Sequence, residues 1–375
     1  MYQKLWPDYE NCLANLPNSI MNYFGVTPVG ATLPLLDNCL KKRCKNIFVI
    51  LLDGMGVNIM EENLDKDGFF RTHLAGCLSS VFPPTTVAAT TSVLSGLMPC
   101  AHAWLGWDCY YPQVDKNVTV FTNKEQGTNA PAADYNIPQR YTGYESVTER
   151  LTKAGCKAHL VTPFQEPHPD SFKLICRQIV RLCRQDGEKY IYAYWNEPDY
   201  IMHMTGCFSK ESKRALGNLQ KQVQKLCKKL KDTLVIVTAD HGHIDSKGVC
   251  ITDYPTITEC LVRMPSIEPR ALNFFVKGGK EKRFEAEFAR YFGKDFLLMT
   301  KQEAIDKKLF GTGDEHPCFR AMLGDYLAVG IGSLTIFNAH KEAERFISVH
   351  AGLTEDEMRI PLVVIDGGRR NKNYV

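Results

Sequence analysis

The chain lacks an apolar run long enough to cross a membrane, a Cys-x-x-Cys pair and a large net charge. A membrane helix needs roughly 18 consecutive apolar residues, and every apolar run in the 375 residues is shorter. The 14 cysteines are scattered, many within apolar or helical stretches, which disfavours a disulfide scaffold. A formal net charge of +3 indicates neither a nucleic-acid nor a membrane-surface partner.

The N-terminal segment, residues 1–26, lacks the uninterrupted apolar core of a secretion signal. We therefore expect a cytoplasmic protein with reduced thiols. The lysine-rich segment 210–231 carries leucines at helical spacing, which is typical of a helix with one solvated face. Hydrophobic content of 44% and charged content of 23% are ordinary for a globular protein, and the length is ample for one large catalytic domain spanning residues 1–375.

The most informative stretch is an apolar run, residues 235–238, that leads into Asp240, His241 and Gly242. An aspartate and a neutral histidine at the end of a strand offer one oxygen and one nitrogen ligand to a divalent ion. The glycine lets a ligand or backbone approach closely. Asp-His pairs also occur in ordinary turns after strands, so the motif alone leaves both interpretations open.

Three further apolar segments end in the same residue types. Residues 46–52 are followed by Asp53, and residues 345–349 by His350. Residues 189–195 lead to Asp199 and His203, which lie one helical turn apart and can share one ion. In open α/β sheets, ligands gather beyond the carboxyl ends of parallel strands. Three aspartates and three histidines there could hold two neighbouring cations, which suits an in-line phosphoryl displacement.

A candidate nucleophile lies in residues 79–96, where two prolines precede Thr85 and Thr86 and a run of small residues follows. A hydroxyl at a helix N-terminus lies near free backbone N–H groups and the positive end of the helix dipole. A metal ion can lower its pKa and make it reactive at neutral pH. The alternative is that both threonines only cap the helix.

Together, these segments resemble the alkaline phosphatase superfamily, and more narrowly its type I phosphodiesterase/nucleotide pyrophosphatase branch. Their order and spacing match that branch from about residue 44 to residue 367. The resemblance implies that one zinc is held by Asp53, Asp240, His241 and the nucleophile. It implies that the second is held by Asp199, His203 and His350. Counting back from Gly96 as in the family gives Thr86 as nucleophile, with Thr85 as the runner-up. Manganese or iron could occupy the same ligands.

The chain departs from nucleotide pyrophosphatases at Ala89, where those enzymes typically carry an asparagine that binds a phosphate oxygen. No sulfatase-type Cys-x-Pro-x-Arg motif is present at Pro83 to Thr86, and the chain lacks room for the inserted domain of phosphoglycerate mutases. We expect hydrolysis of a phosphodiester or pyrophosphate bond in a small phosphate ester or nucleotide-like substrate, through a covalent phosphothreonine. The alternatives are a phosphomonoesterase or phosphonate hydrolase, and a non-catalytic, metal-stabilised binding protein.

The remaining pattern predicts an α/β fold. A helix over 143–154, a strand over 157–162 and a helix over 170–185 give a βαβ rhythm, which indicates a mostly parallel central sheet flanked by helices on both faces. We expect approximately residues 255–335 to form an inserted α+β lid lobe, with strands near 271–277 and 296–299 and helices near 282–292 and 302–309. Lids commonly set specificity. Trp104 and Trp107 are expected to line the pocket mouth, with simple packing as the alternative. His243 is expected beside the ligands or facing solvent.

Overall fold

A six-stranded sheet forms the centre of the computed structural model, which describes residues 2–367. Its strand order is β2-β17-β8-β1-β7-β6. Four neighbours, β8, β1, β7 and β6, run parallel, whereas β17 is antiparallel to both β8 and β2. The strands span Asn46–Leu52 (β1), Leu74–Ser79 (β2), Lys157–Val161 (β6), Lys189–Trp195 (β7), Thr233–Thr238 (β8) and Arg359–Gly367 (β17). The predicted α/β fold is therefore confirmed, with a mixed sheet.

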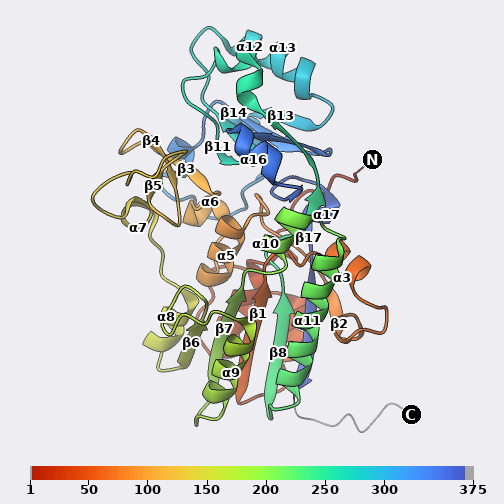
Figure 1. Cartoon of the computed structure of the whole chain (residues 1–375). Helices are drawn as coiled ribbons and strands as arrows, with labels where there is room; N and C mark the ends of the chain where they lie inside the picture. Colours follow the sequence, from red (N-terminus) through yellow and green to blue (C-terminus); the bar gives the residue numbers. More distant parts are fainter. Residues whose placement is uncertain (1, 368–375) are drawn as a thin grey trace.

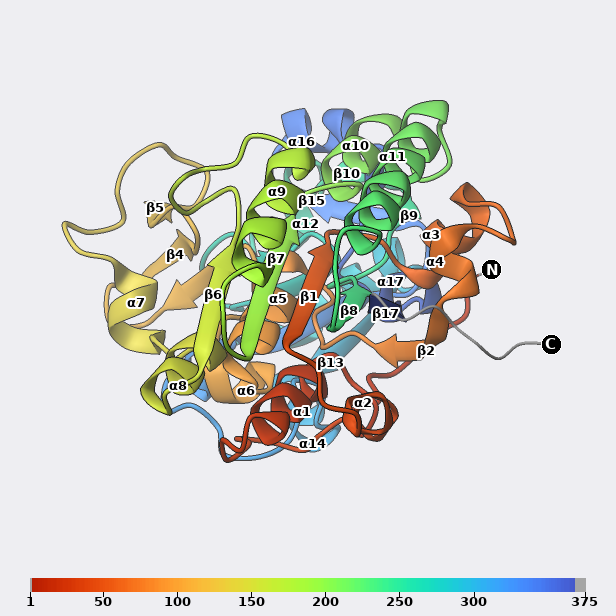
Figure 2. The same cartoon turned by 90° about the horizontal axis from the view of Figure 1, so that it is seen from below.

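Helices cover both faces of this sheet, as Figures 1 and 2 show, with α9 and α11 on one face and α1 and α2 on the other. Both faces of β1 are buried along all of its residues, which explains why its sequence is continuously apolar. The helices outside residues 251–345 are α1 (Asn15–Tyr23), α2 (Pro34–Leu40), α3 (Val57–Asn63), α4 (Phe69–Thr72), α5 (Thr86–Ser95), α6 (Pro99–His102), α7 (Ile137–Thr142), α8 (Val147–Lys153), α9 (Phe172–Cys183), α10 (Asp199–Thr205), α11 (Lys210–Cys227) and α17 (Glu355–Met358).

A second, seven-stranded sheet lies above the first in Figure 1, in the order β13-β14-β12-β11-β3-β4-β5. Its core contains a group of phenylalanines on α13 and the adjoining strands. The strands are β3 (Asp108–Tyr111), β4 (Lys116–Thr119), β5 (Lys124–Glu125), β11 (Ser266–Glu268), β12 (Ala271–Phe274), β13 (Phe296–Thr300) and β14 (Tyr326–Gly330); the helices are α12 (Pro255–Thr258), α13 (Glu281–Phe292), α14 (Lys301–Asp306) and α15 (Phe319–Met322).

This upper sheet is not built from residues 255–335 alone. Ile267 of β11 pairs with Asp108 of β3, so an earlier hairpin completes the sheet of the expected insertion. The remaining short elements connect the two sheets: β9 (Ile244–Asp245), β10 (Lys247–Cys250), η1 (Ile251–Asp253), β15 (Leu334–Phe337), α16 (His340–Arg345) and β16 (Ser348–Val349).

One strand expectation was wrong. Residues 345–349 do not join the parallel sheet, because Arg345 ends α16 and only Ser348 and Val349 form a strand, β16, which pairs antiparallel with β9. His350 therefore reaches the site from a short connection outside the central sheet. All 14 cysteines are free thiols. Within residues 2–367, none of the helices combines the length and the apolar character that crossing a membrane would require.

Candidate metal centre and active site

Three neighbouring strands of the central sheet deliver the aspartates to one place. β1 lies between β7 and β8, and Asp53 follows β1 directly. Asp240 comes shortly after β8, and Asp199 begins α10 after β7. The backbone N–H of Gly54 donates to Asp240 Oδ1 at 3.0 Å, so the turns after β1 and β8 are in direct contact. The expectation that these residues meet beyond the carboxyl ends of the strands holds for all three.

The first group of side chains surrounds His241. Its Nε2 lies 3.3 Å from Asp53 Oδ1 and 3.7 Å from Asp240 Oδ2. The hydroxyl oxygen of Thr86 lies 3.4 Å from the same Nε2 and 3.4 Å from Asp53 Oδ2. Asp53, Asp240 and His241 are buried. The structure therefore brings together the four residues expected to share the first ion.

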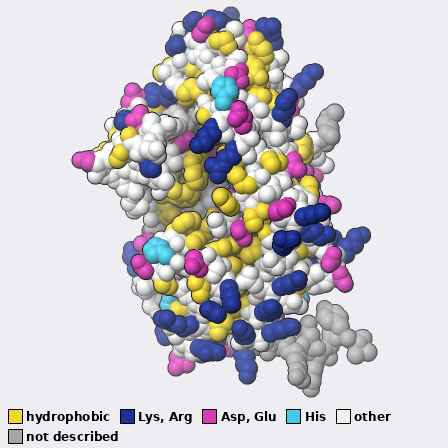
Figure 3. Space-filling model, viewed as in Figure 1, with side chains coloured by type: hydrophobic (Ala, Val, Ile, Leu, Met, Phe, Trp, Pro, Cys, Tyr) yellow, Lys and Arg dark blue, Asp and Glu magenta, His cyan; other side chains and the backbone are white. Residues whose placement is uncertain are grey.

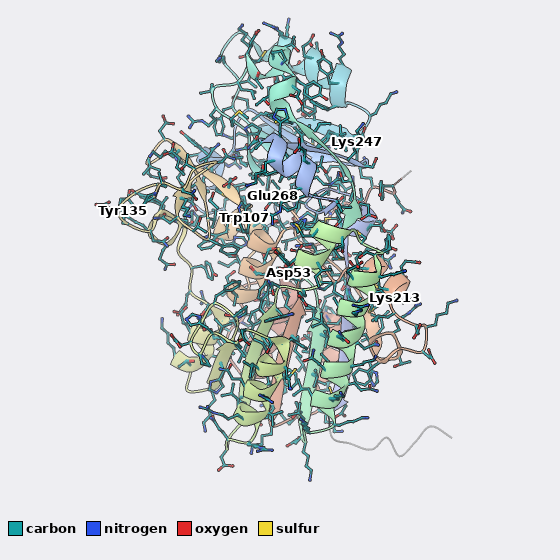
Figure 4. The ribbon with its side chains drawn as sticks, in the orientation of Figure 1. Asp53, Trp107, Tyr135, Lys213, Lys247 and Glu268 are labelled. Atoms are coloured by element: carbon teal, nitrogen blue, oxygen red, sulfur yellow. The ribbon has the colours of Figure 1, made fainter. Side chains whose placement is uncertain are left out.

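The second group surrounds Asp199 Oδ1. The Nε2 atoms of His243, His203 and His350 lie 2.6, 3.3 and 3.7 Å from it. The imidazole rings of His241 and His350 stack with centroids 3.7 Å apart, so the two groups adjoin. Figure 4 shows Asp53 near the junction of the two sheets. All six expected aspartates and histidines thus lie in one cluster, joined by His243.

The histidines are held so that Nε2 faces the cluster. The Nδ1 atoms of His203, His241 and His350 lie 2.7 to 3.1 Å from the backbone carbonyl oxygens of Ser348, Gly242 and Pro84, respectively. A carbonyl oxygen can only accept, so Nδ1 carries the hydrogen and Nε2 presents its lone pair. This arrangement orients histidine ligands in metal sites. Burial lowers the pKa of His350 and keeps it neutral, the form that binds a metal.

The cluster fits a site for divalent metal. Asp53 Oδ1 and Asp240 Oδ2 are buried and accept no hydrogen bond from the residues that the structure describes. Burial, and then the charge of Asp53, raises the pKa of Asp240 well above its usual value. Unpartnered buried carboxylate oxygens are costly unless a cation satisfies them. Two overlapping sets of donor atoms, each within 4.8 Å of one another, lie here: Asp53, Asp199 and His241, and Asp199, His203, His243 and His350.

The two threonines at the start of α5 face different partners. Thr86, the first residue of the helix, faces the cluster. Thr85 precedes the helix but does not cap it with its side chain; its hydroxyl donates instead to Glu268 Oε1 at 2.6 Å. Ala89 is fully buried one turn further along α5. The geometry therefore favours Thr86 over Thr85 as the hydroxyl closest to the cluster, and neither side chain acts as a helix cap.

A cavity of about 370 Å³ opens from the cluster between the two sheets. Thr86, Asp199, His203 and His350 line one part, and Trp107, Glu268 and the residues around α16 line another. Figure 3 shows the molecule hollowed on this face, with hydrophobic side chains inside the hollow, and Figure 4 places Trp107 and Glu268 beside each other above Asp53.

The two tryptophans differ. Trp107 lines the cavity and is 48% exposed. Trp104 does not line it, because its indole N–H donates to the carbonyl of Thr142 at 2.7 Å and its ring packs against Tyr144. Trp104 is therefore a packing residue, which was the alternative prediction for Trp104 and Trp107.

The profile of the family described as type I phosphodiesterase / nucleotide pyrophosphatase matches residues 47–274, more than half of the chain. The chain belongs to this family. No curated protein matched the sequence. The family comprises phosphate-ester hydrolases, so the chain is a hydrolase of this class.

Solved structures show the same fold. Murine ectonucleotide pyrophosphatase/phosphodiesterase 5, an inactive form in complex with AMP, aligns with a TM-score of 0.64 at 14% identity, covering 86% of this chain and 87% of that one. The phosphonoacetate hydrolase of Sinorhizobium meliloti in complex with phosphonoformate aligns with a TM-score of 0.62 at 14% identity, covering 88% of this chain and 92% of that one.

Three residues at the site of this phosphodiesterase-family chain were missed from the sequence or given no role. His243 is buried and bonded to Asp199; its spacing after His241 was the available signal. The hydroxyl of Tyr194, in β7, donates to Asp53 Oδ2, and Glu268 arrives from the upper sheet. No motif or spacing in the sequence marks Tyr194 or Glu268 as a site residue. His316 and Arg320, which the upper part of the molecule also carries, do not line the cavity.

Gly242 should not tolerate a side chain. A Cβ atom there would lie 1.9 Å from the carbonyl oxygen of Asp356, because the turn after β8 packs tightly against α17. We expect Gly242→Ala to lower the free energy of unfolding by about 1–3 kcal/mol, the usual cost of overpacking. Gly217→Ala, in α11 where the added Cβ meets open space, is the matched control and should stabilise slightly. Urea denaturation of both variants gives the comparison; equal stability of the two would contradict the tight packing.

Chelation should destabilise the protein. Without a cation, the like charges of Asp53 and Asp240 face each other in a buried site. A bound ion at a hundred times its dissociation constant adds about 2.7 kcal/mol of stability. The melting temperature measured by calorimetry should therefore fall after dialysis against a chelator and recover with zinc. A melting temperature that responds to neither treatment would count against a metal site.

Proposed function

We propose that the chain is a two-metal phosphoesterase that hydrolyses a phosphodiester or pyrophosphate bond through a covalent phosphothreonine at Thr86. The observation that carries this proposal is the position of the Thr86 hydroxyl, 3.4 Å from both Asp53 Oδ2 and His241 Nε2, at the N-terminus of α5 and on the wall of the cavity. A nucleophile, a ligand cluster and a substrate cavity meet there. A binding protein would not need the hydroxyl.

The chain's own residues suit the proposed reaction. Asp53, Asp240, His241 and Thr86 would hold one ion, and Asp199, His203 and His350 the other. When bound, the two ions would lower the pKa of the Thr86 hydroxyl and stabilise charge on the leaving oxygen. The free N–H groups in the first turn of α5 favour a phosphoryl group beside Thr86.

In the first step, the Thr86 oxygen bonds to phosphorus as the bond from phosphorus to the leaving oxygen breaks, and the hydroxyl proton passes to solvent. Water then bonds to phosphorus, the bond to Thr86 breaks, and the threonine hydroxyl is restored. The covalent intermediate splits one displacement into two easier ones. We propose zinc as the ion, because mixed aspartate and histidine ligands suit it, with manganese or iron as alternatives.

His243 adds a contact that the expected ligand set did not contain. Its Nε2 lies 2.6 Å from Asp199 Oδ1, and its Nδ1 lies 3.1 Å from the hydroxyl of Ser348. Burial lowers the pKa of His243 to about 4, so the ring is neutral. We propose that its main role is to orient Asp199 toward the ion, since both of its nitrogens already have partners.

A phosphonate hydrolase or a phosphomonoesterase is the second candidate function. Ala89 removes the amide that nucleotide pyrophosphatases typically use, and a phosphonoacetate hydrolase shares the fold to nearly the same degree as the murine phosphodiesterase. Both neighbours are solved with small phosphate or phosphonate ligands, which supports a small-molecule substrate.

Turnover of chromogenic esters tests the proposal. Zinc-loaded protein is expected to hydrolyse bis-p-nitrophenyl phosphate faster than p-nitrophenyl phosphate, with a p-nitrophenyl nucleotide ester and phosphonoacetate as further substrates. Elemental analysis of protein purified without chelators should give two ions per chain. Inactivity on all the esters, or one ion or fewer per chain, would contradict the proposed two-metal diesterase; preference for the monoester or the phosphonate would favour the second candidate.

A further inference from the structure

The cavity next to the cluster is acidic on the side that faces the upper sheet. Its lining residues there include three carboxyl side chains, Asp108, Glu268 and Glu342. Arg345 is the one lysine or arginine among the lining residues, and it is exposed, with its guanidinium 5.6 Å from the centroid of the Phe346 ring. A second phosphate group on a substrate would therefore be repelled by these carboxylates, and the exposed Arg345 would be the one lysine or arginine of the lining able to pair with it.

Glu268 is held in one orientation. Its Oε1 accepts a hydrogen bond from the Thr85 hydroxyl at 2.6 Å and another from the backbone N–H of Trp107 at 2.8 Å. Its Oε2 accepts none from the described residues, and the residue lines the cavity. A carboxylate whose rotamer is already fixed loses little entropy when its free oxygen binds a ligand.

The surroundings of Glu268 favour a positive charge. Loss of hydration, and to a smaller extent the charge of Asp108, raises the pKa of both Glu268 and Glu342. Loss of hydration brings the pKa of Glu268 to about 7, and a bound cation would stabilise its ionised form. Two exposed aromatic side chains, Trp107 at 48% and Tyr200 at 55%, line the same cavity and can contact an organic cation through their faces.

We propose that the cavity takes a phosphate ester whose organic group carries a protonated amine, and that Glu268 is the residue that selects it. The inference rests on the proposed function, since the phosphoryl group is taken to lie at Thr86. The ammonium group donates a hydrogen bond to Oε2 of Glu268, and Glu342 adds negative charge at the exposed side. Trp107 and Tyr200 contact the carbon chain.

A pair of isosteric substrates tests this selection. p-Nitrophenyl 2-aminoethyl phosphate carries an ammonium group where p-nitrophenyl propyl phosphate carries a methyl group. Wild-type enzyme is expected to show a kcat/KM at least about tenfold higher for the amine, mainly through KM, as a charge-assisted hydrogen bond provides. In Glu268→Gln, the amide oxygen can still accept from Thr85 and Trp107, but the charge is gone, so kcat/KM should fall much more for the amine than for the propyl ester and the preference should disappear.

Glu344→Gln is the matched control, because Glu344 is an exposed residue of the same helix as Glu342 and does not line the cavity. It should leave the preference unchanged, and Glu342→Gln should reduce it by less than Glu268→Gln. An equal loss of activity on both substrates in Glu268→Gln would show a purely structural role and overturn the proposal, as would the absence of a preference in the wild type.

A binding measurement separates this inference from the proposed function. Calorimetric titration of the Thr86→Ala variant with 2-aminoethyl phosphate and with propyl phosphate, in the presence of zinc, requires no turnover. Binding of the amine that is about tenfold tighter, and no longer tighter when Glu268→Gln is added, supports the inference. This holds even if the wild-type protein hydrolyses neither ester. The lack of hydrolysis would contradict the proposed function instead. Equal binding of the two phosphates overturns the inference even if both esters are hydrolysed.

Discussion

Thr86→Ala is expected to abolish hydrolysis of bis-p-nitrophenyl phosphate, with a loss on the order of 10⁴-fold or more, as when a covalent nucleophile is removed. The Thr86 hydroxyl is the one placed 3.4 Å from both Asp53 and His241, and alanine offers no atom that could bond to phosphorus. Six aspartate and histidine side chains remain to hold metal. Initial rates and elemental analysis of the same preparation therefore separate loss of the nucleophile from loss of the ions.

Thr85→Ala is the control for this substitution. The Thr85 hydroxyl donates to Glu268, so Thr85→Ala removes one hydrogen bond, which is worth about 1 kcal/mol. If this whole amount were added to the activation free energy, the rate would fall roughly fivefold. A phosphorylated peptide containing Thr86, trapped by acid quenching and found by mass spectrometry, would identify the intermediate directly. Unchanged turnover in Thr86→Ala, or complete loss in Thr85→Ala with Thr86→Ala active, would remove the assignment of Thr86.

The strands that carry the aspartates could be predicted from the sequence. The apolar runs over 46–52 and 189–195 coincide with β1 and β7 residue for residue. Parallel strands covered by helices on both faces must be apolar on both sides, so a continuous run followed by an acid marks both the strand and its end. The same logic located Asp240 and His241, because β8 is also buried along its whole length.

Contacts between distant segments could not be predicted in this way. The pairing of β3 with β11 joins residues more than 150 positions apart through a single pair, Asp108 and Ile267, and neither segment has a local pattern that specifies its partner. The strand β17 runs antiparallel between β8 and β2, although its sequence is as apolar as that of a parallel strand. Direction depends on the route of the chain between strands and is not encoded in the apolar pattern.

The site residues fall into the same two groups: those that follow a buried strand, and those placed by contacts between distant segments. Asp53, Asp199, His203, Asp240 and His241 follow buried strands and could be found from spacing. Glu268 lies at the end of a three-residue strand in the upper sheet, and its role is visible only because that sheet packs over Thr85 and Trp107. His350 was also predicted from an apolar run, residues 345–349, although the strand there is only two residues long, and the family resemblance assigned it to the second ion.

The buried ion pair of Arg270 and Glu357 connects the upper sheet to the end of the chain, and its disruption should have the largest effect on stability. Both side chains are fully buried, and the guanidinium donates to the carboxylate through two bonds, Nε to Oε1 at 2.7 Å and Nη2 to Oε2 at 2.9 Å. Nη1 also donates to the carbonyl of Leu334 at 2.7 Å. Glu357 accepts in addition from the backbone N–H of Gly352, two residues after His350.

Arg270→Met is expected to lower the free energy of unfolding by about 3–5 kcal/mol, because it leaves the Glu357 carboxylate buried without a counterion. Guanidinium chloride denaturation followed by circular dichroism measures the change. Arg283→Met is the matched control: Arg283 pairs with Glu259 at 2.9 Å, but both side chains are largely exposed, and breaking such a pair costs at most about 1 kcal/mol. Adding Glu357→Gln to Arg270→Met should recover part of the loss, since the unpaired charge is then removed. If Arg270→Met were no more destabilising than Arg283→Met, the ion pair would not be the connection that holds the upper sheet against the loop carrying His350.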